Sequence, residues 1–376
     1  MTSGCPRTST DEVSYPVEVD YAYDQVDPAM FATATGRGGG LDDWAPLLPP
    51  LAAPGLGEGG TPLIEVETGV FIKDESRNPT WSHKDRMNRI TVSAAVASGA
   101  PGIVVASSGN HGASAAAYAA RAGLRCVVIA GPEMPPAVDS FLNAYEAVVL
   151  PVPWEARWPL MRRIVDRAGL HPVSSVTTTH TGHAFGPEGY KTIAYEIHQG
   201  LGVPAAVFVP TAYGELLFGI WKGFTELRRL GLTDRLPRMY ACQPTAAAPL
   251  AEAVRCGVPA AHVTVGPTEA YSIVSPVSGY RGVVAIQDSG GRVLELSDAQ
   301  LEAAHKELAR VGLWTELSSA AGLAGLRTVV DLEGPVVCIS TSSGFKNRCV
   351  GLRRTETIAP DWDDVRNRLH AAGIGD

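Results

Sequence analysis

Short apolar runs alternate with helix-like segments along most of the chain. Residues 102–106 and 126–130 are apolar runs too short for a helix, and the alanine-rich segment 113–122 lies between them. Strands that alternate with helices predict β-α units and a parallel sheet, and the second half of the chain repeats this alternation. The expected strands are 70–73, 102–106, 126–130, 147–150, 206–210, 239–242 and 335–339, and the expected helices are 90–98, 113–122, 136–145, 157–168, 189–198, 217–230, 298–310 and 319–329.

Two series of β-α units predict an α/β protein with two open-sheet lobes and a cofactor cleft between them. A chain of 376 residues is long enough to bury a core in each lobe. The expected division is an N-terminal arm at 1–40, a larger cofactor-binding lobe made of 41–87 and 186–376, and a smaller, mobile lobe at 88–185. The arm is expected to pack on the surface of the chain or on a partner subunit.

Three polar turns follow expected strands, and ligands bind at the carboxyl ends of strands in open α/β sheets. The turn at 107–112 reads Ser-Ser-Gly-Asn-His-Gly, and its free amides and hydroxyls could hold a carboxylate. The turn at 211–216 has the same topology and could hold a phosphate, while Thr341 could offer a hydroxyl to a ring nitrogen. Each turn taken alone is also compatible with an ordinary helix cap or β-α connection.

The stretch 78–86, Asn-Pro-Thr-Trp-Ser-His-Lys-Asp-Arg, joins the expected strand 70–73 to a helix that begins near Lys84. Lysine is scarce, with six in the chain. The positive end of a helix dipole disfavours an ammonium group, so an amine at this place can be neutral and form an imine with a carbonyl cofactor. Lys84 taken alone could equally be a solvated lysine beside Asp85, but the polar turns elsewhere in the chain favour the imine.

Composition excludes several other classes of function. The net charge of −8 argues against a nucleic-acid partner. No apolar run approaches the roughly 20 residues that cross a membrane. The N-terminus has no basic stretch followed by an apolar one, and the six cysteines are scattered without a Cys-x-x-Cys pair. A cytoplasmic protein with free thiols and no metal site is therefore expected.

The same motifs carry a resemblance to a known family. The stretch 78–86 resembles the N-P-T-G-S-F-K-D-R signature of the fold-type II pyridoxal-phosphate enzymes, and the turn 107–112 is similar to their S-S-G-N-H-G loop. Within that class, the tryptophan synthase beta superfamily, the chain most resembles the threonine synthases. The further motifs that match in the same order are 57–63, 188–196, 220–224, 318–323 and 341–347.

The resemblance implies a role for each turn. Lys84 would hold pyridoxal 5′-phosphate as an imine and would remove the α-proton of the substrate. Asn110 would bond the phenolic oxygen of the cofactor, and Thr341 would face its ring nitrogen. The other expected contacts are, for the cofactor phosphate, the amides of Ala212, Tyr213, Gly214, Glu215 and Leu216, and, for an amino-acid substrate, Ser107, Ser108, Gly109, His111, Trp81 and His183.

Several positions depart from the family pattern. Trp81 stands where the family has a glycine, and Glu215 brings a carboxylate into the phosphate turn. Gly186 stands where threonine synthases carry an arginine that helps bind the substrate phosphate. His180 and His183 are either replacements for that arginine or ordinary loop histidines. The departures predict a divergent substrate.

The expected reaction is elimination or replacement of a β or γ substituent of an amino acid, phosphorylated or otherwise activated. A hydroxyl at position 341 cannot protonate the ring nitrogen as a carboxylate would, so the ring is a weaker electron sink and transamination is disfavoured. Two alternatives remain: a serine or threonine dehydratase, suggested by His111, and a non-catalytic relative that binds a metabolite or partner. The resemblance also implies a homodimer.

Overall fold

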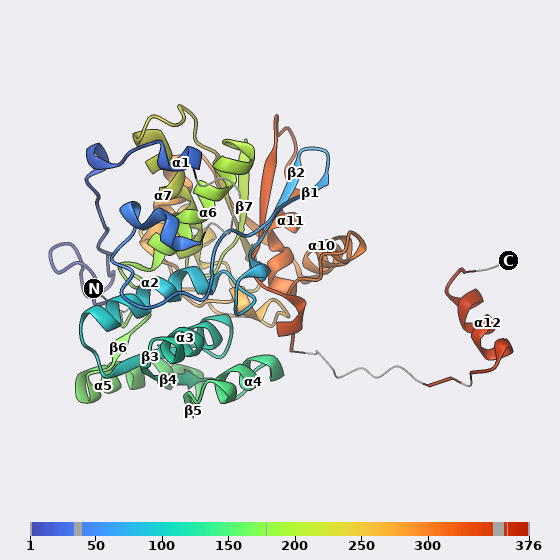
Figure 1. Cartoon of the computed structure of the whole chain (residues 1–376), viewed down its shortest axis with the longest axis horizontal. Coiled ribbons are helices and arrows are strands. Elements are labelled where there is room, and N and C mark those ends of the chain that lie inside the picture. Colours follow the sequence, from blue (N-terminus) through green and yellow to red (C-terminus); the bar gives the residue numbers. More distant parts are fainter. Residues whose placement is uncertain (1, 34–39, 178, 349–356, 359, 375–376) are drawn as a thin grey trace.

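The structure is a computed structural model that describes residues 2–33, 40–177, 179–348, 357–358 and 360–374. Residues 34–39 of the expected N-terminal arm lie outside the described residues. Figure 1 shows two layered bodies, a four-stranded sheet with its helices below and a six-stranded sheet with its helices above. The α/β architecture with two open sheets is as the sequence predicts.

The six-stranded sheet has the order β1-β2-β10-β7-β8-β9. β1 pairs with β2 antiparallel, and all the other pairs are parallel. The two central strands are buried along their whole length, and both are apolar and rich in β-branched residues, as expected of parallel strands covered on both faces. The strands are β1 (Leu63–Glu67), β2 (Val70–Asp74), β7 (Ala206–Pro210), β8 (Arg238–Pro244), β9 (Arg292–Leu296) and β10 (Val336–Ser340).

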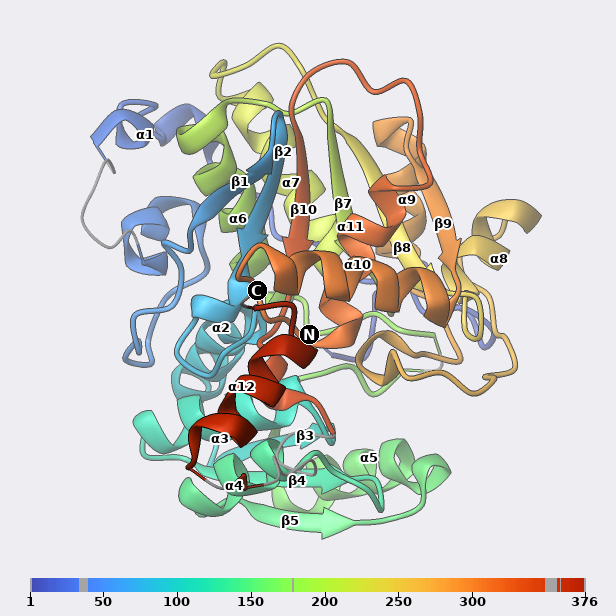
Figure 2. The ribbon, with the colours of Figure 1, turned by 90° about the vertical axis from the view of Figure 1, so that its right-hand side faces the viewer.

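Alternate side chains of β7 enter two different cores. Val207 and Val209 pack with the helices of one face, whereas Ala206 and Phe208 pack with the helices of the other. Figures 1 and 2 show these two helical layers. The first layer contains α6 (Gly186–Leu201), α7 (Glu215–Arg229) and α9 (Tyr280–Ser289), and the second contains α10 (Asp298–Arg310) and α11 (Ala321–Leu326).

The four-stranded sheet is fully parallel, with the order β5-β4-β3-β6. Ile103 and Val105 of β3 pack under the alanine-rich helix α3, while Val104 faces the opposite core with Met161 of α5. The strands are β3 (Gly102–Ala106), β4 (Arg125–Ala130), β5 (Val148–Pro151) and β6 (His171–Pro172), and the helices around them are α2 (Lys84–Ala97), α3 (Asn110–Arg121), α4 (Pro136–Ala144) and α5 (Arg157–Ala168).

α2 links the two bodies, because it packs against both α3 and α6. The strands of the smaller sheet all lie within 102–172. The expected boundary at 87/88 falls inside α2, and the one at 185/186 falls at the start of α6. The division into lobes at these residues, and the mobility of the smaller lobe, stay predictions.

The N-terminal segment lies along α6 and α7 of the same chain. Tyr21 Oη donates to Glu188 Oε2 at 2.8 Å, and Tyr23 Oη donates to Glu226 Oε1 at 2.8 Å. Phe31 of α1 (Met30–Thr33) packs its ring edge-on against Tyr195. These contacts place the described part of the segment on its own chain.

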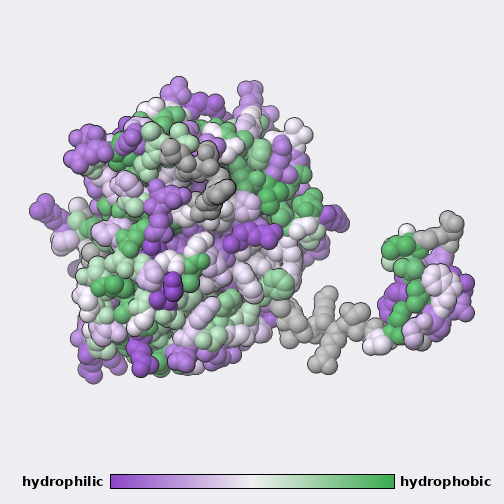
Figure 3. Space-filling model, viewed as in Figure 1, coloured by the Kyte–Doolittle hydropathy of each residue, from purple (hydrophilic) through white to green (hydrophobic). Residues whose placement is uncertain are grey.

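The structure contains several helices and strands that the sequence analysis did not predict. β6, which has two residues, was not predicted, and neither were β9, α8 (Pro249–Cys256) and α9. The expected helix 319–329 is a 3-10 turn at Leu317–Ala320 followed by α11, which ends at Leu326. α12 (Trp362–Ala371) stands apart from the body in Figure 3, with no buried residue. Within the described residues, no helix is long and apolar enough to cross a membrane.

Candidate active site

The loop before Lys84 is held by a buried carboxylate. Asp85 accepts hydrogen bonds from Thr80 N at 2.6 Å and Thr80 Oγ1 at 2.5 Å, and from Ser114 Oγ at 2.6 Å. His83 N donates to Thr341 O at 3.0 Å, which fastens the loop to the end of β10. α2 begins at Lys84, as the sequence predicts. The backbone on either side of Lys84 is therefore held by contacts to α3 and to the residue after β10.

Lys84 is a half-buried amine without a close carboxylate partner among the described residues. Its Nζ donates to Tyr190 Oη at 3.0 Å. Burial lowers the pKa of Lys84, and the more distant carboxylate of Glu215 only partly opposes this effect. A lowered pKa increases the fraction of neutral amine near pH 7, and the neutral amine is the form that attacks a carbonyl group.

The turn at 107–112 leads into α3, whose first residue is Asn110. Asn110 Nδ2 donates to Glu316 Oε2 at 2.8 Å, and Asn110 Oδ1 accepts from Ser342 Oγ at 3.1 Å, so the amide group is oriented from the larger sheet. A Cβ on Gly112 would lie 2.7 Å from Ser107 O, which explains the glycine. The first amides of α3 have no intrahelical acceptor and can bind an anion.

His111 is the second residue of α3. Its Nε2 is buried and has no hydrogen-bond partner among the described residues. Burial and the nearby charge of Lys84 lower the pKa of His111 to about 3. The imidazole is therefore neutral, with one ring nitrogen left without a partner.

The turn at 211–216 leads from β7 into α7. Gly214 has φ +101°, and a Cβ there would lie 2.7 Å from Gly282 Cα, so only glycine fits. The carbonyls of the turn are bonded to the scaffold: Ala212 O accepts from Gln243 Nε2 and Tyr213 O accepts from Gly279 N, both at 3.1 Å. The first amides of α7 have no intrahelical acceptor and can bind an anion.

Glu215, the first residue of α7, carries a buried charge beside this turn. Its Oε2 bonds His180 Nε2 at 2.9 Å, and its Oε1 lies 3.8 Å from Arg281 Nη1 with no hydrogen-bond donor among the described residues. Burial by itself would raise the pKa of Glu215, but His180, Arg281 and Lys84 together lower it to about 2. The carboxylate is therefore ionised at neutral pH.

Two glycines leave room for the Glu215 carboxylate. A Cβ on Gly182 would lie 1.5 Å from Glu215 Oε1, and one on Gly186 would lie 3.6 Å from the same oxygen. The carboxylate of Glu215 thus lies beside position 186, where the family resemblance predicts an arginine. His180, which bonds this carboxylate, is itself stacked on the ring of Tyr213 with a centroid separation of 3.8 Å.

Thr341 lies directly after β10 and is buried. Its Oγ1 is 2.9 Å from Ser319 Oγ, and Ser319 Oγ accepts from Ser342 N at 2.8 Å. Since the oxygen of Ser319 already accepts a hydrogen bond, its own proton can be donated to Thr341. The hydroxyl proton of Thr341 is then free to be donated to a ligand.

A single cavity of about 230 Å³ joins these elements. It brings together Lys84, the turn at 107–111, the turn at 211–216 and Thr341. Arg157 and Arg348, which sequence reasoning did not select, also line it. The predicted site residues in its lining are Lys84, Ser107, Ser108, Gly109, Asn110, His111, Ala212, Tyr213, Gly214, Glu215, Leu216 and Thr341.

Two predicted substrate contacts lie outside that lining. Trp81 is 39% exposed and packs its indole against Phe141 and Phe345. His183 is buried, with its Nε2 3.0 Å from His171 Nε2. The structure brings His180 to the cavity instead of His183. The substrate roles of Trp81 and His183 stay predictions.

Four supporting residues were missed by sequence reasoning. Tyr190 lies within the 188–196 motif, and Ser319 within the 318–323 motif, so the motifs pointed to them without giving a role. Glu316, which bonds Asn110, and Arg157, which lines the cavity, have no local signal in the sequence, because only the tertiary fold brings them to these places.

The donor set fits pyridoxal phosphate. Free amides at a helix start suit a phosphate group, a lysine amine of lowered pKa suits an aldehyde, and a hydroxyl donor suits a ring nitrogen. All three lie on the same cavity.

Comparison with known proteins gives the class. The sequence model of the family described as "Pyridoxal-phosphate dependent enzyme" matches residues 55–342. The chain therefore belongs to this family of pyridoxal-phosphate dependent enzymes, and pyridoxal phosphate is its cofactor.

Within that family the chain is threonine synthase-like. It is 36% identical over 338 residues to the threonine synthase of Mycobacterium tuberculosis (strain ATCC 25618 / H37Rv), covering 85% of this chain and 89% of that protein. It is 34% identical over 324 residues to the threonine synthase of Methanocaldococcus jannaschii, covering 80% and 78%.

Solved structures confirm the fold. Maize serine racemase superposes with a TM-score of 0.66 at 18% identity, covering 83% of this chain and 93% of that one. The processed form of threonine deaminase isoform 2 from Solanum lycopersicum gives 0.63 at 18% identity, covering 84% and 88%.

Proposed function

We propose that the protein eliminates or replaces a β or γ substituent of an amino acid, in the manner of a threonine synthase-like pyridoxal-phosphate enzyme. The observation that carries the proposal is one cavity lined by Lys84, the two anion-binding turns and Thr341. The threonine synthases at 34–36% identity support the reaction class.

Lys84 would hold the aldehyde group of the cofactor as an imine, with loss of water, and would move the α-proton of the substrate. Its lowered pKa and its 3.0 Å hydrogen bond to Tyr190 support both roles, because a neutral amine is the nucleophile and the base. Pyridoxal phosphate, when bound, supplies the electron sink that stabilises negative charge on the α-carbon.

The turns orient the two anionic groups. The amides of 212–216 would hold the cofactor phosphate, because the first amides of α7 have no intrahelical acceptor and the turn lines the cavity. The hydroxyls and amides of Ser107, Ser108 and the start of α3 hold the substrate carboxylate. Neither group needs a lysine or arginine, because free amides at a helix start supply the donors.

Asn110 and Thr341 hold the cofactor ring. Asn110 keeps one amide proton for the phenolic oxygen, since Glu316 takes the other at 2.8 Å. Thr341 gives a neutral hydroxyl to the ring nitrogen, with Ser319 behind it at 2.9 Å. A neutral partner leaves the ring a weaker electron sink than a carboxylate would, which favours loss of a substituent over transamination.

The test is covalent capture followed by product analysis. The protein is reconstituted with pyridoxal phosphate, reduced with borohydride and digested. We expect a visible absorbance band that reduction bleaches, and the label on the peptide containing Lys84. A label on another lysine, or none, would refute the proposal. Incubation with a panel of amino acids and phosphoamino acids then identifies the product.

A dehydratase is the second candidate. The observation in its favour is His111, which lines the cavity and whose buried Nε2 has no hydrogen-bond partner in the part of the chain that the structure describes. A dehydratase releases ammonia and a keto acid from serine or threonine without a second substrate. A keto-acid assay with these two amino acids separates the candidates.

We further propose a cytoplasmic homodimer. The free thiols of Cys126, Cys242 and Cys338, all buried, suit a reducing compartment. The dimer rests on the family resemblance, and light scattering coupled to gel filtration measures it.

A further inference from the structure

Two guanidinium groups line the cavity without a carboxylate partner. Arg157 is the first residue of α5, beside the smaller sheet, and Arg348 follows the turn after β10 in the larger sheet. Within the ranges that the structure describes, neither forms an ion pair. Among the described residues, the cavity lining thus has two guanidinium groups outside any ion pair.

Each of the two arginines is held over an aromatic ring. The guanidinium carbon of Arg157 lies 4.1 Å from the ring centroid of Trp154, and that of Arg348 lies 4.1 Å from the ring centroid of Tyr271. Arg157 Nε also donates to Trp154 O at 3.5 Å. Stacking fixes the plane of a guanidinium group and leaves its Nη edge available for bonds to an oxyanion. The Nε of Arg348 is buried and without an acceptor among the described residues.

The two carboxylates that line the cavity do not neutralise Arg157 or Arg348, so these arginines can bind an anion. Glu215 is paired with His180 and faces Arg281, so its charge is compensated. Glu133 also lines the cavity but is exposed to solvent. An anion beside Gly186 would face the Glu215 carboxylate, since that carboxylate is 3.6 Å from a Cβ at 186.

We propose that Arg157 and Arg348 bind an oxyanion on the side chain of the substrate and select such amino acids over neutral ones. The proposal rests on the proposed function, because it takes the substrate to be an amino acid held in this cavity. The oxyanion is a phosphate ester or a carboxylate, which share the geometry that a guanidinium fork recognises. These residues would supply the cation that position 186 lacks.

The first test is binding, with the cofactor in place so that its phosphate already fills the turn at 211–216. Calorimetry on the holoenzyme uses O-phospho-L-serine, O-phospho-L-homoserine, L-glutamate and inorganic phosphate as probes. We expect Arg157→Gln and Arg348→Gln each to weaken the preferred anionic probe about 10- to 100-fold. Arg167→Gln, an exposed arginine at the end of α5, is the matched control and leaves binding unchanged.

The second test separates recognition from general damage. In steady-state kinetics the two Gln variants should raise KM for the anionic substrate and leave KM for a neutral O-acetyl amino acid unchanged. Arg157→Lys and Arg348→Lys, which keep the charge, should retain more affinity than the Gln variants and serve if those fail to fold. Unchanged binding in both Gln variants, or equal losses for neutral and anionic amino acids, would overturn the proposal.

A failure of the arginine proposal can be distinguished from a failure of the proposed function. Failure of the proposed function appears as the absence of covalent cofactor at Lys84, whatever the arginines do. Failure of the arginine site appears in a holoenzyme whose absorbance band is intact. Phosphoamino acids and glutamate, tested side by side, decide between the phosphate and carboxylate forms.

Discussion

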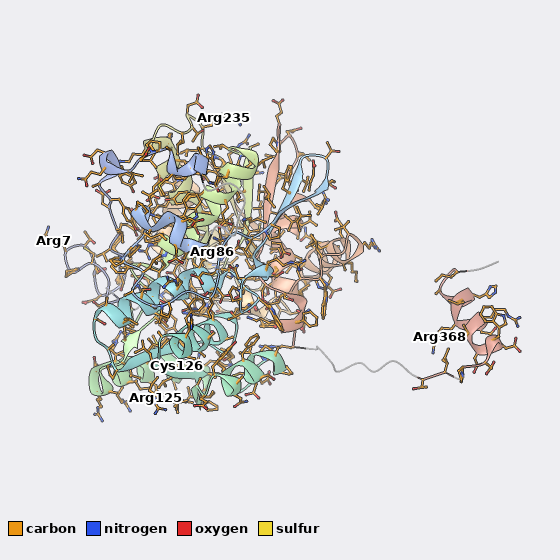
Figure 4. The ribbon with its side chains drawn as sticks, viewed as in Figure 1. Arg7, Arg86, Arg125, Cys126, Arg235 and Arg368 are labelled. Carbon is orange, nitrogen blue, oxygen red and sulfur yellow. The ribbon has the colours of Figure 1, made fainter. Side chains whose placement is uncertain are left out.

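Lys84 and Arg86 are two residues apart in the first turn of α2, yet their surroundings are opposite. Arg86 has a fully buried side chain and bonds Glu75 at 2.7 Å and Glu196 at 2.5 Å. Its remaining donors reach Thr192 Oγ1 and Thr61 Oγ1. Figure 4 shows Arg86 inside the body of the molecule, while Arg7 and Arg235 lie at the periphery.

The difference lies in the pairing of each charge. Burial works against the charge of Arg86, but Glu196 and Glu75 overcome it and raise the pKa of the guanidinium above its ordinary value. Lys84 has a tyrosine hydroxyl as its partner, and burial lowers its pKa. A charge surrounded by carboxylates is fixed and serves the fold, whereas an amine without them can change its protonation state and serve chemistry.

Removal of the unpaired amine gives the largest expected effect. Lys84→Ala should reduce turnover by roughly 10³-fold or more, because the covalent hold and the proton transfer are both lost. The free energy of unfolding of the cofactor-free protein should change by less than about 1 kcal/mol, since no ion pair is broken. Steady-state kinetics and urea unfolding measure the two quantities. A large loss of stability would contradict the contrast with Arg86.

Removal of the paired guanidinium should give the opposite result. Arg86→Met leaves the buried carboxylate of Glu75 without its charged partner and removes one of the two cations on Glu196, which keeps Lys73 at 2.6 Å. The loss of the buried pair should cost about 3–5 kcal/mol of unfolding free energy. Arg229→Met is the control: Arg229 pairs with Asp20 at 3.3 Å and the two side chains are 59% and 81% exposed, so the loss should be no more than about 1 kcal/mol. Equal losses in the two variants, measured by urea unfolding, would show that burial of the pair does not matter.

Glu215 lies between these extremes, since it is charged and paired but has one unsatisfied oxygen. Its pKa is lowered from 4.5 to about 2 in the folded protein. A lowered carboxyl pKa contributes stability that is present above pH 4.5 and is lost as the pH falls toward 2, by roughly 3 kcal/mol in total. Glu215→Gln should remove this contribution, so its stability deficit should shrink as the pH falls. Urea unfolding of both proteins over that range checks the sign, and a deficit that grows on acidification would contradict it.

The sequence was most informative where function depends on a local turn. The turn at 107–112 follows β3 of the smaller sheet, and the turn at 211–216 and Thr341 follow β7 and β10 of the larger sheet. The ends of these strands could be predicted because each strand is a short apolar run. Contacts between distant parts of the chain could not be predicted from the sequence. Glu316 reaches Asn110 across 206 residues, and no periodicity encodes that distance.

Other misses have a different cause. Short elements such as β6, with two residues, carry too few positions to show a pattern. His180 and His183 lie three residues apart in a loop without periodicity, so the sequence could not show which one faces the cavity. Arg157 and Arg348 carry no motif, and only the fold brings them to the same cavity.

Trp81, three residues before Lys84, gives the smallest expected effect and tests whether the stretch is strained. Its φ is +64°, a left-handed conformation that costs a non-glycine residue about 1 kcal/mol. Both Trp81→Ala and Trp81→Gly lose the ring contacts to Phe141 and Phe345, but only the glycine variant relieves the backbone. The glycine variant should therefore be the more stable of the two by about 1 kcal/mol.

A position with ordinary backbone provides the control for that comparison. Ala97 ends α2 in a helical conformation with its side chain exposed. Ala97→Gly should lose up to about 1 kcal/mol, because glycine has more conformational freedom to lose in a helix. The quantity to compare is the difference in unfolding free energy between the Ala and Gly forms at positions 81 and 97, measured by urea unfolding. Opposite signs of this difference at the two positions would locate backbone strain at Trp81. The same sign at both positions would mean that the indole is held by its contacts without backbone cost, and that the loop before Lys84 is as relaxed as the helix that follows it.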